Sequence, residues 1–346
     1  MLAGVGLSKG WLLTRSKLLG VALGLVGVFV LAVPAFASAA LTGAGSTLVA
    51  PLMANWISGF EGGTGTGVKY SAVGSGEGIK QIANRTVDFG ASDAPMTSEQ
   101  AAECGGCLTI PWALTATGVG VNVPGVSKVN LSGPVLAEIF MGKITKWNDK
   151  KIVKLNPKAK LPSTTITPIF RSDGSGDTYA FTNYLSKVSP AWRSQFGFGT
   201  SVGFKDGVGA KGNTGVTSSL KTPGAIGYVA AAYLIGAGIH AAAIENAAGN
   251  FALPNLTNIE EAASVVKSVR PNSGVSIVAP PKSATKAYPI STFTYAIVPS
   301  DASQASAVKE FINYAITKGQ SFGAALDFAP LPNVVLSAAQ KTLGSL

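Results

Sequence analysis

Hydrophobic positions alternate between two spacings along this chain. Short apolar runs predict strands at 68–72, 87–90, 109–112, 118–123, 165–171, 225–229 and 291–298. Between several of these runs, apolar residues recur at helical spacing, as in the face formed by Leu48, Leu52, Met53, Trp56, Ile57 and Phe60. Alternating strands and helices predict an α/β fold, and 346 residues suffice for two domains with separate cores.

The same spacing predicts further helices after 76 and after 178. Thr97 and Gln100 form a capping-box pattern that predicts a helix running toward Cys104. Another predicted helical stretch closes at 143–149. The alanine- and glycine-rich segment after Tyr228 fits neither pattern, and without a long linker we expect interleaved rather than serial domains.

Three predicted helices begin at small, hydroxyl-bearing turns. These turns are Gly43-Ala-Gly-Ser-Thr47, Gly74-Ser75-Gly76 and Gly174-Ser175-Gly176. The first amides of a helix lack intrahelical partners and lie at the positive end of its dipole, so they attract anions. Each turn alone is also compatible with an ordinary strand-to-helix connection. If the three turns converge, they surround a small oxyanion with donors.

Two charged residues extend this pattern. Arg171 ends the predicted strand before the third turn and offers a planar guanidinium to an anion. Asp93 follows the predicted strand at 87–90, where open α/β sheets place ligand contacts. A turn or helix-capping role is the alternative for Asp93, although Thr97 is the better cap. A carboxylate beside an anion suits a ligand that carries a proton, since the carboxylate can accept a hydrogen bond from it.

The N-terminus predicts export. Lys9, Arg15 and Lys17 precede an apolar run at 18–31, and small residues at 35–37 and 37–39 offer cleavage sites. We expect a signal peptide at 1–39 and a mature chain from Ala40; a retained membrane anchor is the alternative.

Removing the three cations of this segment lowers the net charge from +10 to +7. A basic chain suits an anionic ligand or surface. We expect no nucleic acid partner, because lysines and arginines are scattered without a basic run that would follow a phosphate backbone.

The cysteines and the histidine offer little chemistry. Cys104 and Cys107 form Cys-Gly-Gly-Cys, which in an exported protein favours a small local disulfide over a redox-active pair. His240 is the only histidine and lies in an apolar stretch. We therefore expect no metal site, no cofactor and no histidine-assisted nucleophile.

Seven ordered stretches carry a resemblance to a known family. They are 41–47, 74–82, 86–95, 142–147, 171–176, 212–213 and 223–228. In these stretches the chain resembles the phosphate-binding proteins of high-affinity phosphate ABC transporters. The resemblance implies a type II periplasmic-binding fold, with two α/β lobes joined by crossing hinge strands. It puts 41–117 and 291–346 in the first lobe and 118–290 in the second.

The resemblance also implies the binding residues. On the first lobe these are Ser46, Thr47, the Leu48 amide, Ser75 and Asp93; on the second they are Arg171, Ser175, Gly176 and Asp177. Asp173 matches the acid that pairs with the binding arginine. Leu48 stands where an aromatic residue is common, and Asp177 where a threonine is common. Asp177 could bind through its amide with its carboxylate at the helix N-terminus, accept a second phosphate proton, or leave the hydroxyl role to Thr178; we favour the amide role.

The family function is non-enzymatic capture of inorganic phosphate in the periplasm for an inner-membrane permease. We expect a monomer. Arsenate, sulfate or molybdate are alternative ligands, and Asp93 argues against sulfate, which carries no proton at neutral pH. A secreted phosphatase is the alternative from another class, although neither a metal cluster nor a nucleophile–base pair is evident.

Overall fold

A computed structural model describes residues 40–346 of the protein. These residues belong to one compact unit. The predicted signal peptide and both of its cleavage sites lie outside the described residues. Within 40–346, no helix has the length and apolar character that crossing a bilayer requires.

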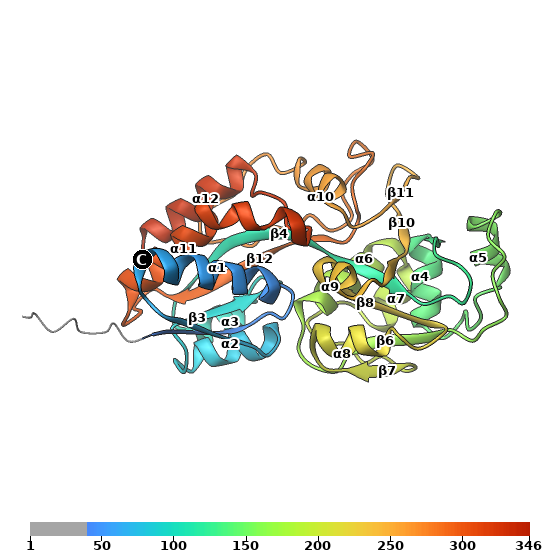
Figure 1. Ribbon diagram of the computed structural model, residues 1–346, viewed down its shortest axis with the longest axis horizontal. Coiled ribbons are helices and arrows are strands. Elements are labelled where there is room, and N and C mark those ends of the chain that lie inside the picture. Colours follow the sequence, from blue (N-terminus) through green and yellow to red (C-terminus); the bar gives the residue numbers. More distant parts are fainter. Residues whose placement is uncertain (1–39) are drawn as a thin grey trace, which may run out of the picture. The chain divides into compact units, whose positions relative to one another are not determined.

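A nine-stranded mixed sheet runs through the described chain (Figure 1). Its order is β2-β1-β3-β12-β4-β8-β6-β7, and β9 also pairs with β4. The α/β expectation is confirmed. The strands are β1 Leu41–Gly45, β2 Val68–Ala72, β3 Phe89–Ser92, β4 Cys107–Val121, β6 Thr167–Arg171, β7 Val208–Ala210, β8 Ala225–Ala230, β9 His240–Ala241 and β12 Ser291–Pro299.

Two lobes share this sheet. In the first lobe, β1 pairs in parallel with β2 and β3, and β12 runs antiparallel to β3 and β4. In the second lobe, β6 pairs in parallel with β7 and β8. A smaller sheet of β5 Asn130–Leu131, β10 Ala243–Glu245 and β11 Phe251–Ala252 lies beside the second lobe. Parallel neighbours place their carboxyl ends at one edge, which is where ligands contact such sheets.

β4 corrects the prediction of two strands at 109–112 and 118–123. It is one strand of 15 residues, all buried. Its first part pairs with β12, and from Thr117 onward it pairs with β8. The residues between the predicted strands stay extended because neighbours on one lobe and then the other supply their hydrogen bonds. β4 thus crosses from the first lobe to the second (Figure 1).

Helices cover both lobes. On the first lobe they are α1 Ala50–Thr64, α2 Ser75–Ala83, α3 Ser98–Glu103, α11 Ala305–Ile316 and α12 Asn333–Gly344, with 3₁₀ turns η1 Lys318–Phe322 and η2 Ala324–Leu326. The second lobe carries α4 Gly133–Phe140, α5 Lys150–Leu155, α6 Gly176–Val188, α7 Pro190–Gln195, α8 Gly212–Ser219 and α9 Ala231–Ala237, and α10 Leu256–Ala263 packs on β4 and β12.

The prediction that a helix ends at 143–149 is wrong. α4 ends at Phe140, and α5 starts only at Lys150. Trp147 lies between them, fully buried, with its indole N–H donating to the Gly224 carbonyl at 3.0 Å. Burial of this side chain against the turn before β8 holds the intervening chain as a loop, which overrides its helical spacing. The capping box at Thr97 and Gln100 is confirmed at the start of α3.

Aromatic packing fixes the elements that lead to the sheet edge. In the first lobe, Trp56 of α1 packs edge-on against Trp112 of β4, with ring centroids 5.2 Å apart. In the second, Phe181 of α6 stacks on Tyr228 of β8 at 4.5 Å. These buried contacts hold the first turns of α1 and α6 in place, because a close-packed core allows little movement.

Candidate functional site

The predicted binding turns of the two lobes meet at one place. Ser75, at the start of α2, accepts a hydrogen bond from the Gly176 amide at 3.1 Å. The Gly76 amide donates to the Gly174 carbonyl at 3.0 Å. The convergence that the sequence could only suggest is therefore present. The predicted residues that gather here are Ser46, Thr47, Leu48, Ser75, Asp93, Arg171, Asp173, Ser175, Gly176, Asp177 and Thr178.

Close approach at this meeting point requires glycine. A Cβ added to Gly176 would overlap the side chain of Asp93. Gly74 has a φ of +100°, and a Cβ there would lie 2.6 Å from Asp173 Oδ2. Residues with side chains would hold the two lobes apart, so these glycines allow the backbones to come together.

Asp93 directly follows β3 and is 2% exposed. Its carboxylate accepts hydrogen bonds from Ser46 Oγ at 2.6 and 2.8 Å and from Ser75 Oγ at 3.3 Å. Burial and then the charge of Asp177 raise the pKa of Asp93 to about 7, although the Ser46 hydrogen bond and Arg171 act in the opposite direction. Thr97, not Asp93, caps α3. Asp93 is thus a buried acceptor facing the second lobe.

Arg171 ends β6 and is held by two carboxylates. Asp173 accepts from Nε at 2.7 Å and from Nη2 at 2.5 Å, and Asp177 accepts from Nη1 at 3.2 Å. Burial lowers the pKa of Arg171, but the Asp173 hydrogen bonds and the charges of both carboxylates leave it raised. The same contacts lower the pKa of Asp173 against the effect of burial. The guanidinium is therefore charged and fixed in one orientation.

Asp177 is fully buried in the first turn of α6. Besides Arg171, its carboxylate accepts from Thr117 Oγ1 and from Asn213 Nδ2, each at 2.8 Å. Burial raises the pKa of Asp177, and Arg171 and these donors offset part of that rise. The carboxylate therefore contacts residues of β4, β6 and α8. The role favoured from the sequence, in which Asp177 binds through its amide, does not account for these side-chain contacts.

Asn213 contacts the site but was not among the predicted binding residues. Its Nδ2 donates to Thr47 Oγ1 at 2.8 Å across the lobes as well as to Asp177, and its Oδ1 accepts from the Ala230 amide at 2.9 Å. The matching stretch at 212–213 was the available signal. Gly212, with a φ of +66°, begins α8, and Asn213 in the first turn reaches Thr47 of the first lobe.

Other predicted residues hold the local turns. Ser46 Oγ accepts from the Leu48 amide at 3.0 Å, so this amide is engaged within its own turn. Ser175 caps α6 by accepting from the Thr178 amide at 3.3 Å. The Thr178 hydroxyl lies 2.8 Å from the Tyr228 hydroxyl, which itself accepts from the Arg171 amide at 3.0 Å. Thr178 thus faces Tyr228.

Cys104 and Cys107 form a disulfide outside this site. They join the end of α3 to the start of β4, and both are buried near Ile79, Ile82 and Ile297. The pair connects neighbouring elements of the first lobe.

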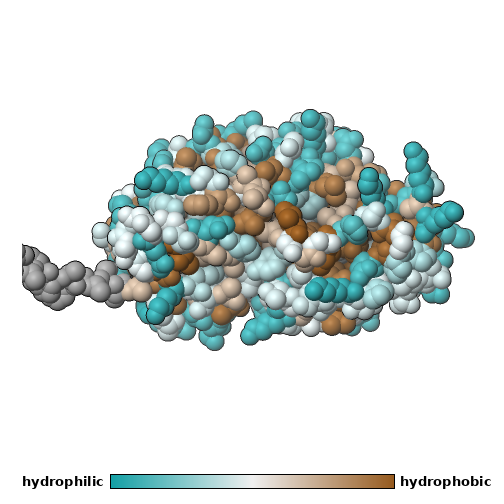
Figure 2. Space-filling model, viewed as in Figure 1, coloured by the Kyte–Doolittle hydropathy of each residue, from teal (hydrophilic) through white to brown (hydrophobic). Residues whose placement is uncertain are grey.

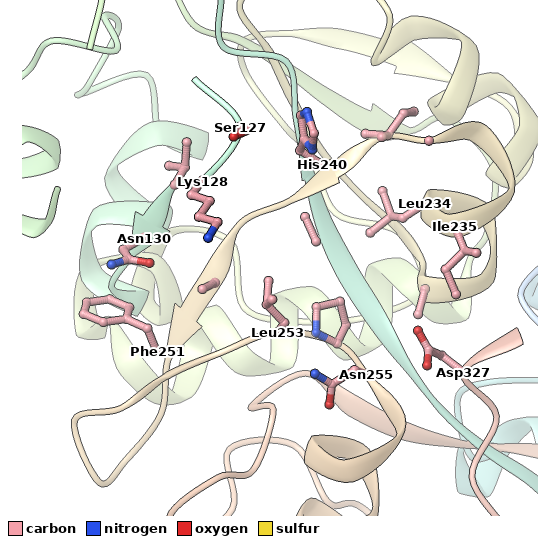
Figure 3. A pocket seen from close by; sticks show the side chains of 17 residues that line it. Ser127, Lys128, Asn130, Leu234, Ile235, His240, Phe251, Leu253, Asn255 and Asp327 are labelled. Atoms are coloured by element: carbon pink, nitrogen blue, oxygen red, sulfur yellow. The ribbon is translucent and has the colours of Figure 1, made fainter. Parts of the chain in front are cut away.

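A separate cavity of about 690 Å³ lies beside α9, β10 and β11 (Figure 3). Leu234, Ile235, Phe251 and Leu253 form much of its apolar wall, and His240 also lines it. None of the predicted binding residues does. Across residues 40–346, no cluster of three or more His, Cys, Asp or Glu side chains is placed to hold a metal ion.

A family model described as the PBP superfamily domain matches residues 32–318. A high-affinity periplasmic phosphate-binding protein, PfluDING, solved with bound phosphate, has the same fold, with a TM-score of 0.72. It is 23% identical, and the match covers 88% of this chain and 93% of that one.

Relatives of higher sequence identity identify the family within this superfamily. The phosphate-binding protein PstS of Xylella fastidiosa strain Temecula1 is 38% identical over 301 residues, covering 85% of this chain and 82% of that protein. PstS of Haemophilus influenzae is 39% identical over 303 residues, covering 86% and 90%. The chain belongs to the PstS family of phosphate-binding proteins, as its motifs suggested, and the predicted type II periplasmic-binding fold is confirmed.

Proposed function

We propose that this protein is a periplasmic receptor that captures inorganic phosphate between its two lobes and delivers it to an ABC-type importer. The observation that carries the proposal is the contact across the lobes between Ser75, which donates to Asp93, and the Gly176 amide at the start of α6. Family membership supports the ligand, since the curated relatives and the phosphate-bound neighbour are named for it.

Phosphate would bind among donors from both lobes. Arg171 supplies positive charge, and the first turns of α1, α2 and α6 supply amides and the positive ends of helix dipoles. Thr47, Ser75 and Ser175 add hydroxyls, with Ser46, the Leu48 amide and the Gly176 amide beside them. Their present hydrogen bonds to one another would exchange for bonds to the oxyanion, so that few donors are left unpaired.

Asp93 would select a protonated anion. An ionised carboxylate accepts a hydrogen bond from the P–OH of phosphate but repels the unprotonated oxygens of sulfate. Buried sites built around one such bond discriminate by roughly 10⁴–10⁵-fold, because the wrong ligand leaves a polar group unpaired. Arsenate carries the same proton and would still bind.

Asp177 would act mainly through its amide and by orienting Arg171. Its carboxylate is already satisfied by Thr117, Asn213 and Arg171, which supports a positioning role. Asp173 would hold the other side of the guanidinium and partly offset its charge. Direct acceptance of a second phosphate proton by Asp177 is the competing role.

The two lobes would close on phosphate as a hinged clamp. We assign 41–117 and 291–346 to the first lobe and 118–290 to the second. The change of β4 partners between Ala116 and Thr117 supports the first boundary, and the start of β12 at Ser291 supports the second. Ligand would stabilise the closed form, and a permease that recognises closure would then receive it. We propose that the receptor works as a monomer and without catalysis.

Calorimetric titration of the mature protein tests this function. At about pH 8.5 the Asp93 carboxyl is ionised, so phosphate and arsenate should bind while sulfate and molybdate bind at least about 10⁴-fold more weakly. In Asp93→Asn the difference in affinity between phosphate and sulfate should become much smaller. Equal losses of affinity for both anions would refute the role of Asp93 as a hydrogen-bond acceptor.

Two outcomes would overturn the receptor itself. One is phosphate binding no tighter than that of the other oxyanions in the wild-type protein. The other is steady release of phosphate from a generic phosphate ester, which would indicate an enzyme. Asp88→Asn is a matched control for the aspartate change, because Asp88 accepts from Thr42 away from the site.

A further inference from the structure

The second lobe carries a concentrated basic surface. Residues 143–160 contain seven lysines, no arginine and one acid, Asp149. All seven lysines are exposed, at positions 143, 146, 150, 151, 154, 158 and 160. The cations of this chain are therefore not scattered throughout, contrary to the expectation from its sequence.

This surface has a rigid base. Trp147 and Ile152 are fully buried beneath it, and Asn156 Nδ2 donates to the Asn130 and Ile152 carbonyls at 2.9 Å each. The lysines stand on α5 and its flanking loops, at the end of the second lobe (Figure 1). Hydrophilic side chains project at that end of the space-filling view (Figure 2).

Most of its charge is unneutralised. Lys151 pairs with Glu138 at 2.6 Å, and it is the only one of the seven that forms an ion pair with another residue of 40–346. Asp149 caps α5 by accepting from the Lys151 amide at 2.8 Å. Six lysine ammonium groups therefore face solvent within one short segment and remain available to an anionic partner.

The composition of this surface favours a bilayer over a protein or a nucleic acid. Protein interfaces are enriched in arginine and aromatic residues and depleted in lysine. Clusters of four to eight basic residues bind layers of anionic lipid headgroups, where separate point charges need no fixed partner. Val153 of α5 is 41% exposed, three residues after Lys150 and one before Lys154. An exposed apolar side chain next to lysines suits the interface of a membrane.

We propose that the lysine surface at 143–160 docks the protein on anionic phospholipid headgroups, with Val153 entering the headgroup layer. This role is separate from the proposed capture of phosphate between the lobes, because none of the predicted binding residues lies in 143–160. It would hold the protein at the bilayer with α5 facing the lipid.

Cosedimentation with lipid vesicles tests the proposal. The mature protein should bind vesicles of phosphatidylglycerol mixed with phosphatidylcholine, and added salt should weaken this binding through screening. The triple variant Lys146→Glu/Lys150→Glu/Lys154→Glu should bind at least about tenfold more weakly, given the contribution of each lysine near an anionic surface. Val153→Ser should weaken binding by a smaller factor.

A matched triple variant separates local docking from net charge. Lys267→Glu/Lys282→Glu/Lys341→Glu makes the same change in charge on exposed lysines elsewhere and should retain most vesicle binding. Both triple variants should keep wild-type phosphate affinity, which also shows that they fold. Equal losses in the two triple variants, equal binding to pure phosphatidylcholine, or binding to DNA or an acidic peptide but not to anionic vesicles would each overturn the proposal.

Discussion

At Asp93, burial and hydrogen bonding act on one carboxyl group in opposite directions. Removal from water and the nearby Asp177 favour the neutral form, whereas Ser46 and Arg171 favour the ionised form. Burial prevails, and the pKa rises from 3.8 to about 7. A carboxyl that titrates near neutrality can change protonation as the proposed ligand binds, which an ordinary surface aspartate cannot do in that range.

This shift predicts a dependence of stability on pH. Between about pH 4 and about pH 7 the folded protein binds a proton at Asp93 that the unfolded chain does not hold, so stability falls as pH rises through this window. Asp93→Asn is uncharged throughout. Without phosphate, the free energy of unfolding of wild type should fall between about pH 5 and about pH 8, and that of Asp93→Asn should not. The stability of the variant relative to wild type should therefore rise by about 2–4 kcal/mol over this range.

Urea unfolding of both proteins at the two pH values measures this difference. Asp88→Asn controls for the loss of an aspartate outside the site. A free energy of unfolding that changes in parallel for wild type and Asp93→Asn would mean that Asp93 does not titrate in this window.

At the level of elements, the disulfide should contribute modestly to stability. It closes a loop with a sequence separation of only 3, so it removes little conformational entropy from the unfolded chain. Cys104→Ala/Cys107→Ala should lower the free energy of unfolding by about 2 kcal/mol. Phosphate affinity should stay unchanged, since the pair lies outside the site.

Urea denaturation and calorimetry check the two parts of this prediction. Reduction of the wild-type protein should reproduce the loss in stability. Loss of phosphate binding in the double variant, with the fold intact, would instead connect the disulfide to the site.

Elements were predictable where local pattern and tertiary packing agree. The strands at 68–72, 225–229 and 291–298 lie within β2, β8 and β12, and the strand predicted at 87–90 is displaced to Phe89–Ser92. β1 was missed, because Leu41–Gly45 has little apolar alternation to mark it. The break expected in β4 and the helix expected at 143–149 failed because cross-lobe pairing and Trp147 burial are absent from a local pattern.

For the whole molecule, side-chain and backbone hydrogen bonds join the two lobes. Asn213 contributes one of them through Thr47. A net hydrogen bond is worth about 1 kcal/mol, so Asn213→Ala should weaken phosphate binding by roughly five- to tenfold and reduce the compaction that phosphate induces.

Calorimetry gives the affinity, and small-angle X-ray scattering with and without phosphate gives the compaction. Asn250→Ala is the matched control, because its side-chain amide donates to the Thr285 carbonyl away from the candidate site. If phosphate binds wild type without lowering its radius of gyration, the protein does not close on this ligand.

Sequence alone determined the chemistry available to this protein: small helix starts, one arginine at a strand end, and an aspartate better suited to bind than to cap. These follow from residue type and neighbours within a few positions, which is the range over which turns and helix ends form. Its resemblance to a family also supplied the fold.

Tertiary structure decided which of these groups meet and in what state. The contact of Ser75 with Gly176 joins residues 101 positions apart, and Asp177 is satisfied by Thr117 and Asn213 from other elements. Burial then sets the pKa of Asp93. Desolvation and long-range contact depend on the folded surroundings of a residue, and no local pattern contains them.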